Sequence, residues 1–434
     1  MDTIFAPLTL KGRCSIYVIR ISGSEVINCL EKFGIRDLKP RFSTLCSLTD
    51  FQKTTFEKVV VLDEALVTYF QAPNTFTGED VCEISLHCST YIIGRFFDLL
   101  NSLGIRMAER GEFSKRAYLN NKLDLVQAES IVDLVNSETE LQHRQAINQL
   151  RGGTSKFYED LREKIIQILS LMEAYIDFPE EVLPEESIKS NIDTIIAFIE
   201  KHLKDNRIGE RIKNGFKIAI IGEPNVGKST LLNFFAKREV AIVSDIAGTT
   251  RDVIEVHLDV NGIPVTLYDT AGIRETEDII ENEGVKRAIL KAEEADLKIL
   301  LVSPDNPEPN IEIAKLIDEQ TITVMNKSDL LNKTTTHISI SLKDNTNLDA
   351  FIKEIETRLD KMISPNIDTT ITNERYRLEL QNCLEQLKLF DLKNKLEINT
   401  EHIRIAANHI GKITGKIDVN EILDNIFGKF CIGK

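Results

Sequence analysis

The chain has 434 residues, enough for two or three domains that each bury a hydrophobic core. Charged residues make up 28% and hydrophobic residues 42%, and no apolar run approaches the ~18 residues that a membrane span needs, so we expect a soluble protein without a membrane partner. The formal net charge of −15 excludes a surface that binds nucleic acid throughout, although it allows a local site.

Cysteine usage and the N-terminus indicate a reducing compartment. The seven cysteines form no CxxC pair, and their odd number argues against a disulfide framework. Residues 1–3 (MDT) lack the basic region and apolar core of a secretion signal. We therefore predict a cytoplasmic location.

Residues 1–118 predict an α+β domain. A helical segment at 91–103 accompanies short β-rich runs at 16–21, 59–62, 65–70 and 81–86. From residue 119 to 214 apolar residues recur at intervals of three and four, which is typical of long amphipathic helices. A proline-containing acidic stretch at 178–186 separates two of them.

Residues 222–229 (GEPNVGKS) match the phosphate-loop pattern GxxxxGK[ST]. An apolar strand at 216–221 precedes them and an amphipathic helix at 230–235 follows. The glycines let backbone N–H groups surround a phosphate at a helix N-terminus, Lys228 reaches the outer phosphates, and the Ser229 hydroxyl can ligate Mg²⁺. A flexible Gly/Pro turn is the alternative, but the complete match between a strand and a helix favours nucleotide binding.

Two further motifs follow in chain order. Residues 248–252 (GTTRD) form a candidate switch segment whose Thr250 can complete the Mg²⁺ shell. Residues 269–272 (DTAG) end an apolar strand at 265–268, which places Asp269 to hold the metal through water and the Gly272 N–H near the γ-phosphate.

Residues 326–329 (NKSD) specify the base. They directly follow a strand at 321–325, and an aspartate there accepts from both N1–H and the 2-amino group of guanine, which adenine does not offer together. This disfavours an ATPase. Residues 341–343 (SLK) stand after a strand at 338–340, and the five motifs together resemble the Ras-like GTPase superfamily, which usually has SAK in this place. The predicted nucleotide contacts are Asn225, Val226, Gly227, Lys228, Ser229, Thr230, Ser244, Asp245, Ile246, Ala247, Gly248, Thr249, Thr250, Asp269, Thr270, Ala271, Gly272, Asn326, Lys327, Ser328, Asp329, Ser341, Leu342 and Lys343.

The chain after residue 365 is again helical, over 373–430. We predict a multidomain α/β protein in which an inserted Ras-like P-loop GTPase domain (215–365) interrupts one helical bundle (119–214 and 366–434) behind an N-terminal α+β domain (1–118). Two independent helical units are the alternative.

Four further segments make the resemblance specific. The chain ends in FCIGK (430–434), and RISG (20–23), FTGED (76–80) and NNKLDL (120–125) lie in its first third. With these motifs the whole chain resembles the tRNA-modification GTPase family called MnmE or TrmE. The resemblance implies homodimeric, potassium-stimulated GTPases. With the flavoprotein MnmG (GidA), which carries FAD, they form a heterotetramer or larger complex. The complex adds a carboxymethylaminomethyl or aminomethyl group to C5 of the wobble uridine, position 34, of certain tRNAs.

The resemblance also implies a folate site in the N-terminal domain. It would hold 5,10-methylene-tetrahydrofolate, the one-carbon donor, or its analogue 5-formyl-tetrahydrofolate, through Arg20, Glu83, Lys122 and Lys434. A carboxylate such as Glu83 can bind the amide and amino edge of a pterin, whereas the glutamate tail of a folate calls for cations. Ordinary surface charges are the alternative. The family has a glycine-rich PPGRGG turn where this chain has LTLKGRCS (8–15), a departure that leaves the loop shape open.

In Ras-like enzymes a glutamine directly after the DxxG motif orients the attacking water, but this chain has Ile273 there. The resemblance implies two substitutes. K⁺ would bind Asn225, Ser244, Ile246 and Thr249, and Glu281 would be the catalytic acid. Glu281 also fits a merely charged surface with Glu275, Glu277, Asp278 and Glu283.

A regulatory switch GTPase of ribosome assembly is the competing function. Such a protein shares the five nucleotide motifs, but it normally carries a recognisable RNA-binding appendage. It would need neither the terminal CIGK nor a folate-binding domain.

Overall fold

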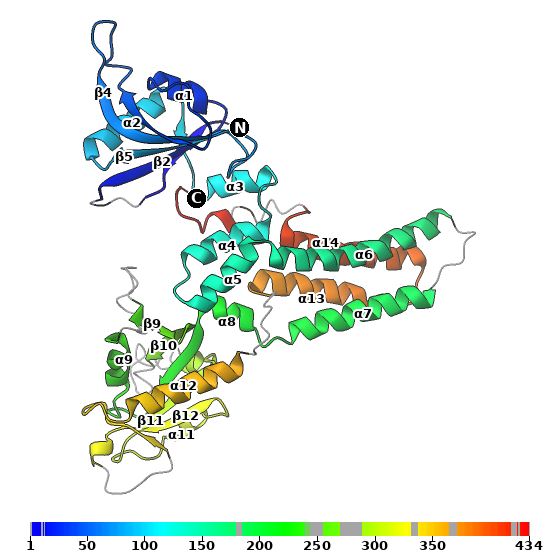
Figure 1. Cartoon of the computed structure of the whole chain (residues 1–434). Coiled ribbons are helices and arrows are strands. Elements are labelled where there is room, and N and C mark those ends of the chain that lie inside the picture. The colour runs from blue at the N-terminus through cyan, green and yellow to red at the C-terminus, as the bar shows by residue number, and fades with distance from the viewer. Residues whose placement is uncertain are drawn as a thin grey trace, which may run out of the picture. The chain divides into compact units, whose positions relative to one another are not determined.

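The structure is a computed structural model of the whole chain, shown in Figure 1. It describes residues 2–9, 12, 14–178, 185–238, 241–242, 255–269, 289–330, 337–363, 371–417, 423 and 426–433. The chain forms two compact units. The first comprises residues 1–132, 149–160 and 410–434, and the second comprises residues 133–148 and 161–409. The domain boundaries that we drew from the sequence stay predictions.

The first unit contains a six-stranded sheet in the order β3-β4-β5-β2-β1-β6. All neighbours in it are antiparallel except β1 and β6, which are parallel. Its strands are β1 (Ile4–Pro7), β2 (Ile16–Ser22), β3 (Ser43–Thr49), β4 (Val61–Phe70), β5 (Val81–His87) and β6 (Arg106–Met107). Its helices are α1 (Val26–Lys32), α2 (Thr90–Ser102) and α3 (Glu112–Leu119), and the predicted α+β character is confirmed.

The core of this sheet is built from apolar side chains at alternating positions along its strands. In β2, Tyr17, Ile19 and Ile21 are buried between positions that reach solvent, which is the period of a strand with one covered face. From α2, Phe96, Leu99 and Leu100 pack into the same core at helical spacing.

One strand was mispredicted as two. The sequence predicted separate strands at 59–62 and 65–70, whereas β4 runs unbroken from Val61 to Phe70. The polar Asp63 and Glu64 do not interrupt it because both have partners: Asp63 accepts from the backbone N–H of His87 at 2.8 Å, and Glu64 accepts from the Ser47 hydroxyl at 2.6 Å. β3 was not predicted at all.

The C-terminal segment belongs to the first unit. Phe427 and Phe430 pack with Leu125 of α4 (Leu125–Val135) in a small apolar cluster. Ile432 forms an antiparallel bridge with Arg110, just before α3, and the Tyr118 hydroxyl donates to the carbonyl of Gly415 at 2.7 Å. The two ends of the chain therefore contribute to one folded unit.

The second unit contains a helical bundle built from both sides of the P-loop region. Its long helices are α7 (Glu185–Leu203), α13 (Glu374–Lys388) and the larger parts of α6 (Gly153–Asp177) and α14 (Leu396–Thr414), which lie side by side in Figure 1. Ion pairs join α7 to α13 (Glu200 to Lys388, 2.6 Å) and α6 to α14 (Glu173 to Arg404, 2.9 Å). The prediction of one interrupted bundle is therefore confirmed, and the alternative of two independent helical units is not.

Two shorter helices connect this bundle to the P-loop region. They are α5 (Glu140–Leu150) and α8 (Ile208–Asn214), and α8 ends one residue before the first strand of the next sheet. Arg377 of α13 is buried against α8, where its Nε donates to Glu210 at 3.1 Å.

A seven-stranded sheet forms the rest of the second unit, in the order β13-β12-β11-β7-β10-β9-β8. Its strands are β7 (Phe216–Ile221), β8 (Ala241–Ile242), β9 (Glu255–Val260), β10 (Ile263–Asp269), β11 (Leu297–Val302), β12 (Thr321–Met325) and β13 (Ile338–Ser339). The five strands from β13 to β10 are parallel, and β9 and β8 add an antiparallel edge.

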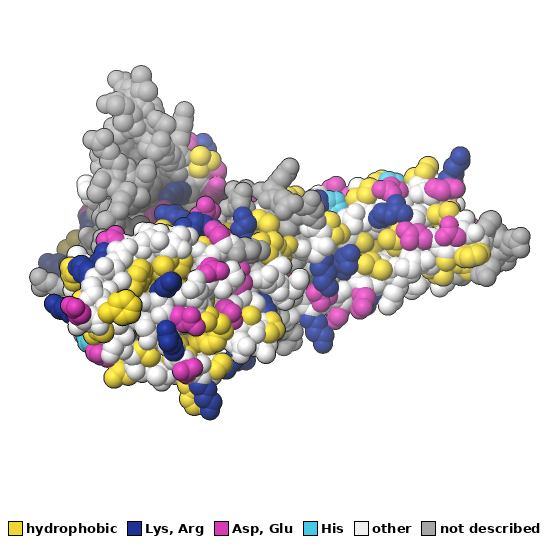
Figure 2. Space-filling model, turned by 90° about the horizontal axis from the view of Figure 1, so that it is seen from above, with side chains coloured by type: hydrophobic (Ala, Val, Ile, Leu, Met, Phe, Trp, Pro, Cys, Tyr) yellow, Lys and Arg dark blue, Asp and Glu magenta, His cyan; other side chains and the backbone are white. Residues whose placement is uncertain are grey.

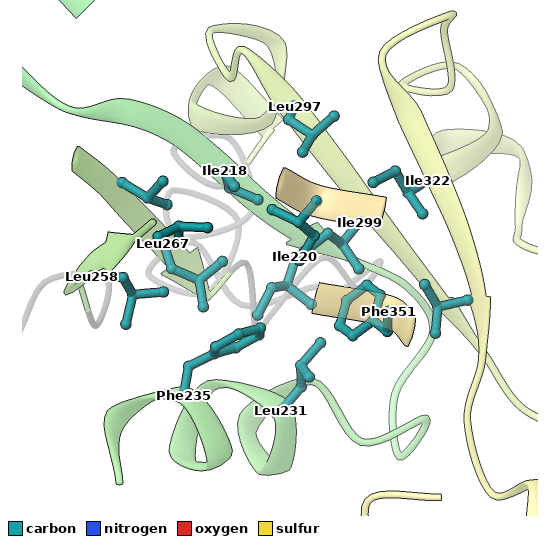
Figure 3. Packing of buried hydrophobic residues seen from close by; sticks show 14 of the residues in the cluster. Ile218, Ile220, Leu231, Phe235, Leu258, Leu267, Leu297, Ile299, Ile322 and Phe351 are labelled. Carbon is teal, nitrogen blue, oxygen red and sulfur yellow. The ribbon is translucent and has the colours of Figure 1, made fainter. Parts of the chain in front are cut away.

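Helices α9 (Lys228–Ala236) and α12 (Leu348–Met362) bury their apolar stripes against this sheet. Figure 3 shows Leu231 and Phe235 of α9 and Phe351 packed against Ile220 and Ile299 of the central strands. β11 is buried along its whole length, which a central parallel strand requires. The short elements α11 (Ile311–Ala314) and η1 (Ser328–Leu330) complete the region.

The described surface carries charges of both signs. On the face in Figure 2, acidic and basic side chains are interspersed with apolar ones. Within the described ranges, no helix is both long enough and apolar enough to cross a bilayer.

Candidate functional site

The parallel strands of the second sheet end at a common edge, and the nucleotide motifs follow these ends. The register pairs Ile221 of β7 with Leu300 of β11, and Val302 at the end of β11 with Met325 at the end of β12. Asp269, the last residue of β10, pairs with Ile220. Segments that leave parallel strands at one edge meet there, which is where α/β sheets bind ligands.

The phosphate loop needs glycine at two positions. Gly222 has φ +152°, and a Cβ there would lie 2.3 Å from the carbonyl oxygen of Leu301. Gly227 has φ +108°, and a Cβ there would lie 2.4 Å from Nδ2 of Asn326. The loop therefore approaches β11 and the NKSD segment more closely than any side chain allows.

Lys228 begins helix α9 and lies over this loop. Its ammonium donates to the carbonyl oxygens of Gly222 at 2.8 Å and Glu223 at 2.9 Å. Ser229 and Thr230 are exposed in the first turn of the helix, where the backbone N–H groups have no acceptor within the helix. A cationic side chain and a helix N-terminus at one loop form a phosphate site.

Asn326 ties the base motif to the phosphate loop. It is buried, its Nδ2 donates to the carbonyl oxygen of Val226 at 2.8 Å, and its Oδ1 accepts from the backbone N–H of Leu342 at 3.2 Å. One side chain therefore holds three of the predicted motifs together. Asn326 is therefore a structural link between these motifs.

Asp329 and Lys327 lie on the exposed side of this link. The hydroxyl of Ser341 donates to Oδ1 of Asp329 at 3.0 Å, which orients the carboxylate. Lys327 has φ +57° and its Nζ lies 3.3 Å from the carboxylate of Asp305. Ser328 and Lys343 complete the described residues of the two motifs, and Lys343 is exposed.

Sequence analysis missed the segment that follows β11. Asp305 contacts Lys327, and the backbone N–H of Asn310 donates to Glu223 of the phosphate loop at 2.8 Å. The run 303–310 therefore borders both the phosphate and the base regions. The signal was present, because polar residues directly follow an apolar strand here as they do in the other motifs.

Several predicted residues lie outside the part of the chain that the structure describes, and for Asp269 only the backbone is described. The residues outside are Ser244, Asp245, Ile246, Ala247, Gly248, Thr249, Thr250, Thr270, Ala271, Gly272, Ile273, Glu281 and Lys434.

A second cluster lies in the first unit, around Arg20 of β2 and Glu83 of β5, which are direct cross-strand partners. The Nε and Nη2 of Arg20 donate to Oε1 of Glu83 at 3.0 and 2.7 Å. The guanidinium also lies 5.2 Å from the ring centroid of Phe76 and 5.5 Å from that of Phe113. Both side chains are partly exposed. Oε2 of Glu83 has no hydrogen-bond partner among the described residues, and so it can accept from a ligand.

Lys122 lies at the same loop. Its Cε is 3.2 Å from where a Cβ of Gly78 would be, and Nδ2 of the neighbouring Asn120 donates to the carbonyl of Thr77 at 2.6 Å. The loop at 76–78 thus contacts Arg20 on one side and the Asn120–Lys122 segment on the other. Two of the four predicted folate residues, Arg20 and Lys122, therefore border one loop, and Glu83 is paired with Arg20.

Arg116 of α3 holds this loop in place, and it was not predicted. It is 3% exposed, and its Nη1 donates to Glu79 at 3.1 Å and to the backbone carbonyl of Asp2. Its Nη2 donates to Glu112 at 3.0 Å. Burial opposes ionisation of Glu112, but hydrogen bonds from Arg106, the Glu109 backbone and Arg116 outweigh it and lower the pKa of Glu112 to about 2.

Comparison with known families covers nearly the whole chain. A family model described as "GTP-binding protein TrmE N-terminus" matches residues 3–122, and one described as "MnmE helical domain" matches residues 125–431. A protein of Rickettsia bellii (strain OSU 85-389), "tRNA modification GTPase MnmE", is 46% identical over 450 aligned positions, and each chain is covered completely.

Two further matches extend this comparison. A protein of Rickettsia rickettsii (strain Sheila Smith) with the same description is 47% identical over 451 positions, again with both chains covered completely. Among solved structures, the G domain of the T. maritima FeoB iron transporter matches with a TM-score of 0.27 and 22% identity, and it covers 34% of this chain and 98% of that domain. On the family models and the full-length relatives, this chain belongs to the MnmE family of tRNA modification GTPases.

Proposed function

We propose that this protein is a potassium-dependent GTPase that acts with a flavin-containing partner, MnmG, on tRNA. The product is a carboxymethylaminomethyl or aminomethyl group at C5 of the wobble uridine, with 5,10-methylene-tetrahydrofolate as the one-carbon source. The hydrogen bond from Asn326 to Val226 carries the GTPase part of this proposal, because it joins the phosphate loop to the guanine-reading segment.

Different described residues would bind the phosphates, the base and the metal ion of GTP. The backbone around Gly222–Gly227 surrounds the phosphates, and Lys228 exchanges its contacts with the Gly222 and Glu223 carbonyls for phosphate oxygens. Asp329, oriented by Ser341, accepts from the guanine edge, and the stem of Lys327 covers the base plane. Ser229, Thr250 and Asp269 would hold Mg²⁺, which neutralises charge on the β- and γ-phosphates when bound.

The chain lacks the glutamine that orients the attacking water in Ras-like enzymes, since residue 273 is isoleucine. K⁺ would bind Asn225, Ser244, Ile246 and Thr249, and when bound it supplies positive charge where the transition state develops negative charge. Asn225 fits this role because it is exposed and has φ +62°, a conformation that asparagine tolerates better than most residues. Glu281 would orient the attacking water.

The folate proposal rests on Arg20, Glu83 and Lys122. Oε2 of Glu83 is directed to accept from a pterin edge, whereas Lys122 and Lys434 offer cations to the carboxylates of the glutamate tail. The ring of Phe76 beside Arg20 is exposed and supplies apolar surface for a flat heterocycle, whereas Phe113 is buried and packs behind the guanidinium.

A homodimer is supported by the edge of the first sheet. β3 is the terminal strand, and its Leu45 is opposite Leu66 of β4 with 68% and 48% of the two residues exposed. Val61 of β4 and Phe42 before β3 are also exposed. An apolar edge strand is suited to a second copy of the chain.

The competing function, a regulatory switch of ribosome assembly, is tested in cells that lack the protein. We expect mass spectrometry of their tRNA nucleosides to show loss of the C5 group from the wobble uridine, with ribosomal subunit profiles unchanged. Intact wobble nucleosides together with defective subunits would favour the switch instead. The role of K⁺ is tested separately, because equal GTPase rates in K⁺ and Na⁺ would remove it from the proposal.

A further inference from the structure

Two cysteines lie side by side at one end of the first sheet. The Sγ of Cys14 donates to the Sγ of Cys88 at a sulfur–sulfur distance of 3.0 Å. Cys14 precedes β2 and Cys88 follows β5, and the backbone N–H of Cys88 donates to the carbonyl of Ser15 at 3.2 Å. This bond continues the ladder of β2 and β5 beyond the pair of Ile16 and His87. The backbone therefore holds the two thiols together.

These thiols differ from the buried cysteines of the same unit. Cys14 is exposed and Cys88 partly exposed, whereas Cys29 and Cys82 are buried in the core. Burial makes Cys29 and Cys82 inaccessible, raises the pKa of Cys29 to about 12 and holds the pKa of Cys82 well above its usual range. The hydrogen bond to Cys88 also raises the pKa of Cys14, so exposure, rather than acidity, distinguishes the pair. Only an exposed pair can meet a reagent from solution.

The distance between the two sulfur atoms is close to that of a disulfide bond. A disulfide has a sulfur–sulfur distance of about 2.05 Å, so the two atoms need to approach by only about 1 Å. A metal site would need further ligands, and in the described part of the chain no group of three or more His, Cys, Asp or Glu side chains is placed to hold a metal.

We propose that Cys14 and Cys88 form a reversible disulfide by exchange with a low-molecular-weight disulfide such as glutathione disulfide. The deprotonated thiol of Cys14 attacks one sulfur of the small disulfide, which forms a mixed disulfide and releases one thiolate that takes up a proton. The deprotonated thiol of Cys88 then attacks the Cys14 sulfur and releases the second small thiol. Two protein thiols are oxidised and one small disulfide is reduced to two thiols.

The bond would join the segment before β2 to the end of β5. These two strands also carry Arg20 and Glu83, so oxidation fixes one end of the strand pair that bears the proposed folate residues. A disulfide between 14 and 88 restricts the unfolded chain and the local separation of residues 14–15 from the end of β5. In a reducing compartment such a bond is transient and senses oxidation.

The test begins with the reduced full-length protein, which is exposed to glutathione disulfide, alkylated and digested without reduction. For the wild type we expect a peptide bearing Cys14 linked to the peptide bearing Cys88, with no glutathione retained on either, and full reversal by dithiothreitol. Fragment ions place the bond, because Cys82 shares a tryptic peptide with Cys88.

Variants separate the two steps of exchange. Cys88→Ser removes the resolving thiol, so Cys14 should retain glutathione at a level about tenfold above wild type. The control Cys431→Ser, at another exposed cysteine, should form the 14–88 link as the wild type does. The proposal is wrong if wild type retains as much glutathione on Cys14 as Cys88→Ser does, or if Cys14 links to a different cysteine. The wild-type map decides the matter even if a variant fails to fold.

Discussion

The two candidate sites are built from different parts of the polypeptide. The edge of the second sheet is formed by backbone: strand ends, a helix N-terminus and two glycines against which Leu301 and Asn326 pack. The Arg20–Glu83 cluster of the first unit is formed by side chains that already pair with each other and with Phe76 and Phe113. A ligand at the edge of the second sheet meets donors fixed by the fold, whereas a ligand at the Arg20–Glu83 cluster must compete with an existing ion pair.

This difference sets what mutations do. A backbone site fails when the path of the chain changes, even if every polar side chain is kept. A side-chain site fails when one charge is removed, even if the fold is intact.

Gly222→Ala should abolish nucleotide binding. The added Cβ would lie 2.3 Å from the Leu301 carbonyl oxygen in β11, so the loop must move. We expect GTP affinity, measured with a fluorescent nucleotide, to fall by about 100-fold or more. Gly262→Ala is the matched control, since it has φ +84° but its Cβ would meet nothing closer than Glu140 at 3.7 Å. Equal affinities for the two variants would refute the backbone account of the site.

Glu112→Gln should destabilise the first unit in a pH-dependent way. The folded-state pKa of Glu112 is lowered from 4.5 to about 2, so its contribution is fully present above pH 4.5 and disappears as pH falls toward 2. We expect wild type to be more stable by about 2 kcal/mol at pH 7, measured by urea unfolding of the first unit. The gap should shrink at pH 3, and a gap that is constant with pH would contradict the role of this carboxylate.

Glu83→Gln should weaken folate binding while leaving GTP binding unchanged. Because Oε1 of Glu83 accepts from Arg20, only Oε2 is available to the pterin edge, and an amide nitrogen in its place cannot accept, so 5-formyl-tetrahydrofolate affinity should fall about tenfold by calorimetry. Glu64→Gln, on the exposed side of the neighbouring strand β4, should bind as wild type does. If both variants bind folate normally, the ligand is held elsewhere.

Asp305→Asn should have the smallest effect. Its carboxylate lies 3.3 Å from Nζ of Lys327 at an exposed position, where ion pairs contribute little. We expect GTP affinity to fall by about two- to threefold and the loss to diminish in high salt. A loss as large as that of Gly222→Ala would mean that the exposed Lys327–Asp305 ion pair contributes as much to nucleotide binding as the backbone of the phosphate loop.

The difference between a site formed by backbone and a site formed by side chains also explains which parts of the two sites could be predicted from the sequence. The phosphate loop, Asn326–Asp329 and Ser341–Lys343 have fixed spacings because each follows a strand end, and the structure brings these described segments together. Arg116 and Phe113 gave no such signal. From helix α3, Phe113 reaches Arg20 and Arg116 reaches Glu79 beside the loop at 76–78, and only tertiary packing brings them there.

Strand prediction failed where polar residues are satisfied by neighbours. Asp63 and Glu64 suggested a turn, but partners on β5 and β3 let β4 continue through them. β11 was not predicted as a strand, so the residues after it, including Asp305, were not examined as part of the site. A local pattern cannot show which partners lie across a sheet.

Reconstitution of the reaction tests the central claim most directly. The purified protein, its flavoprotein partner, unmodified tRNA, GTP, methylene-tetrahydrofolate and an amine donor (glycine or an ammonium salt) are combined in K⁺, and wobble nucleosides are measured by mass spectrometry. The account predicts a C5 group on the wobble uridine that disappears when GTP or the folate is omitted, or when Gly222→Ala replaces wild type. Modification that continues at the same rate without GTP or without the folate would contradict it.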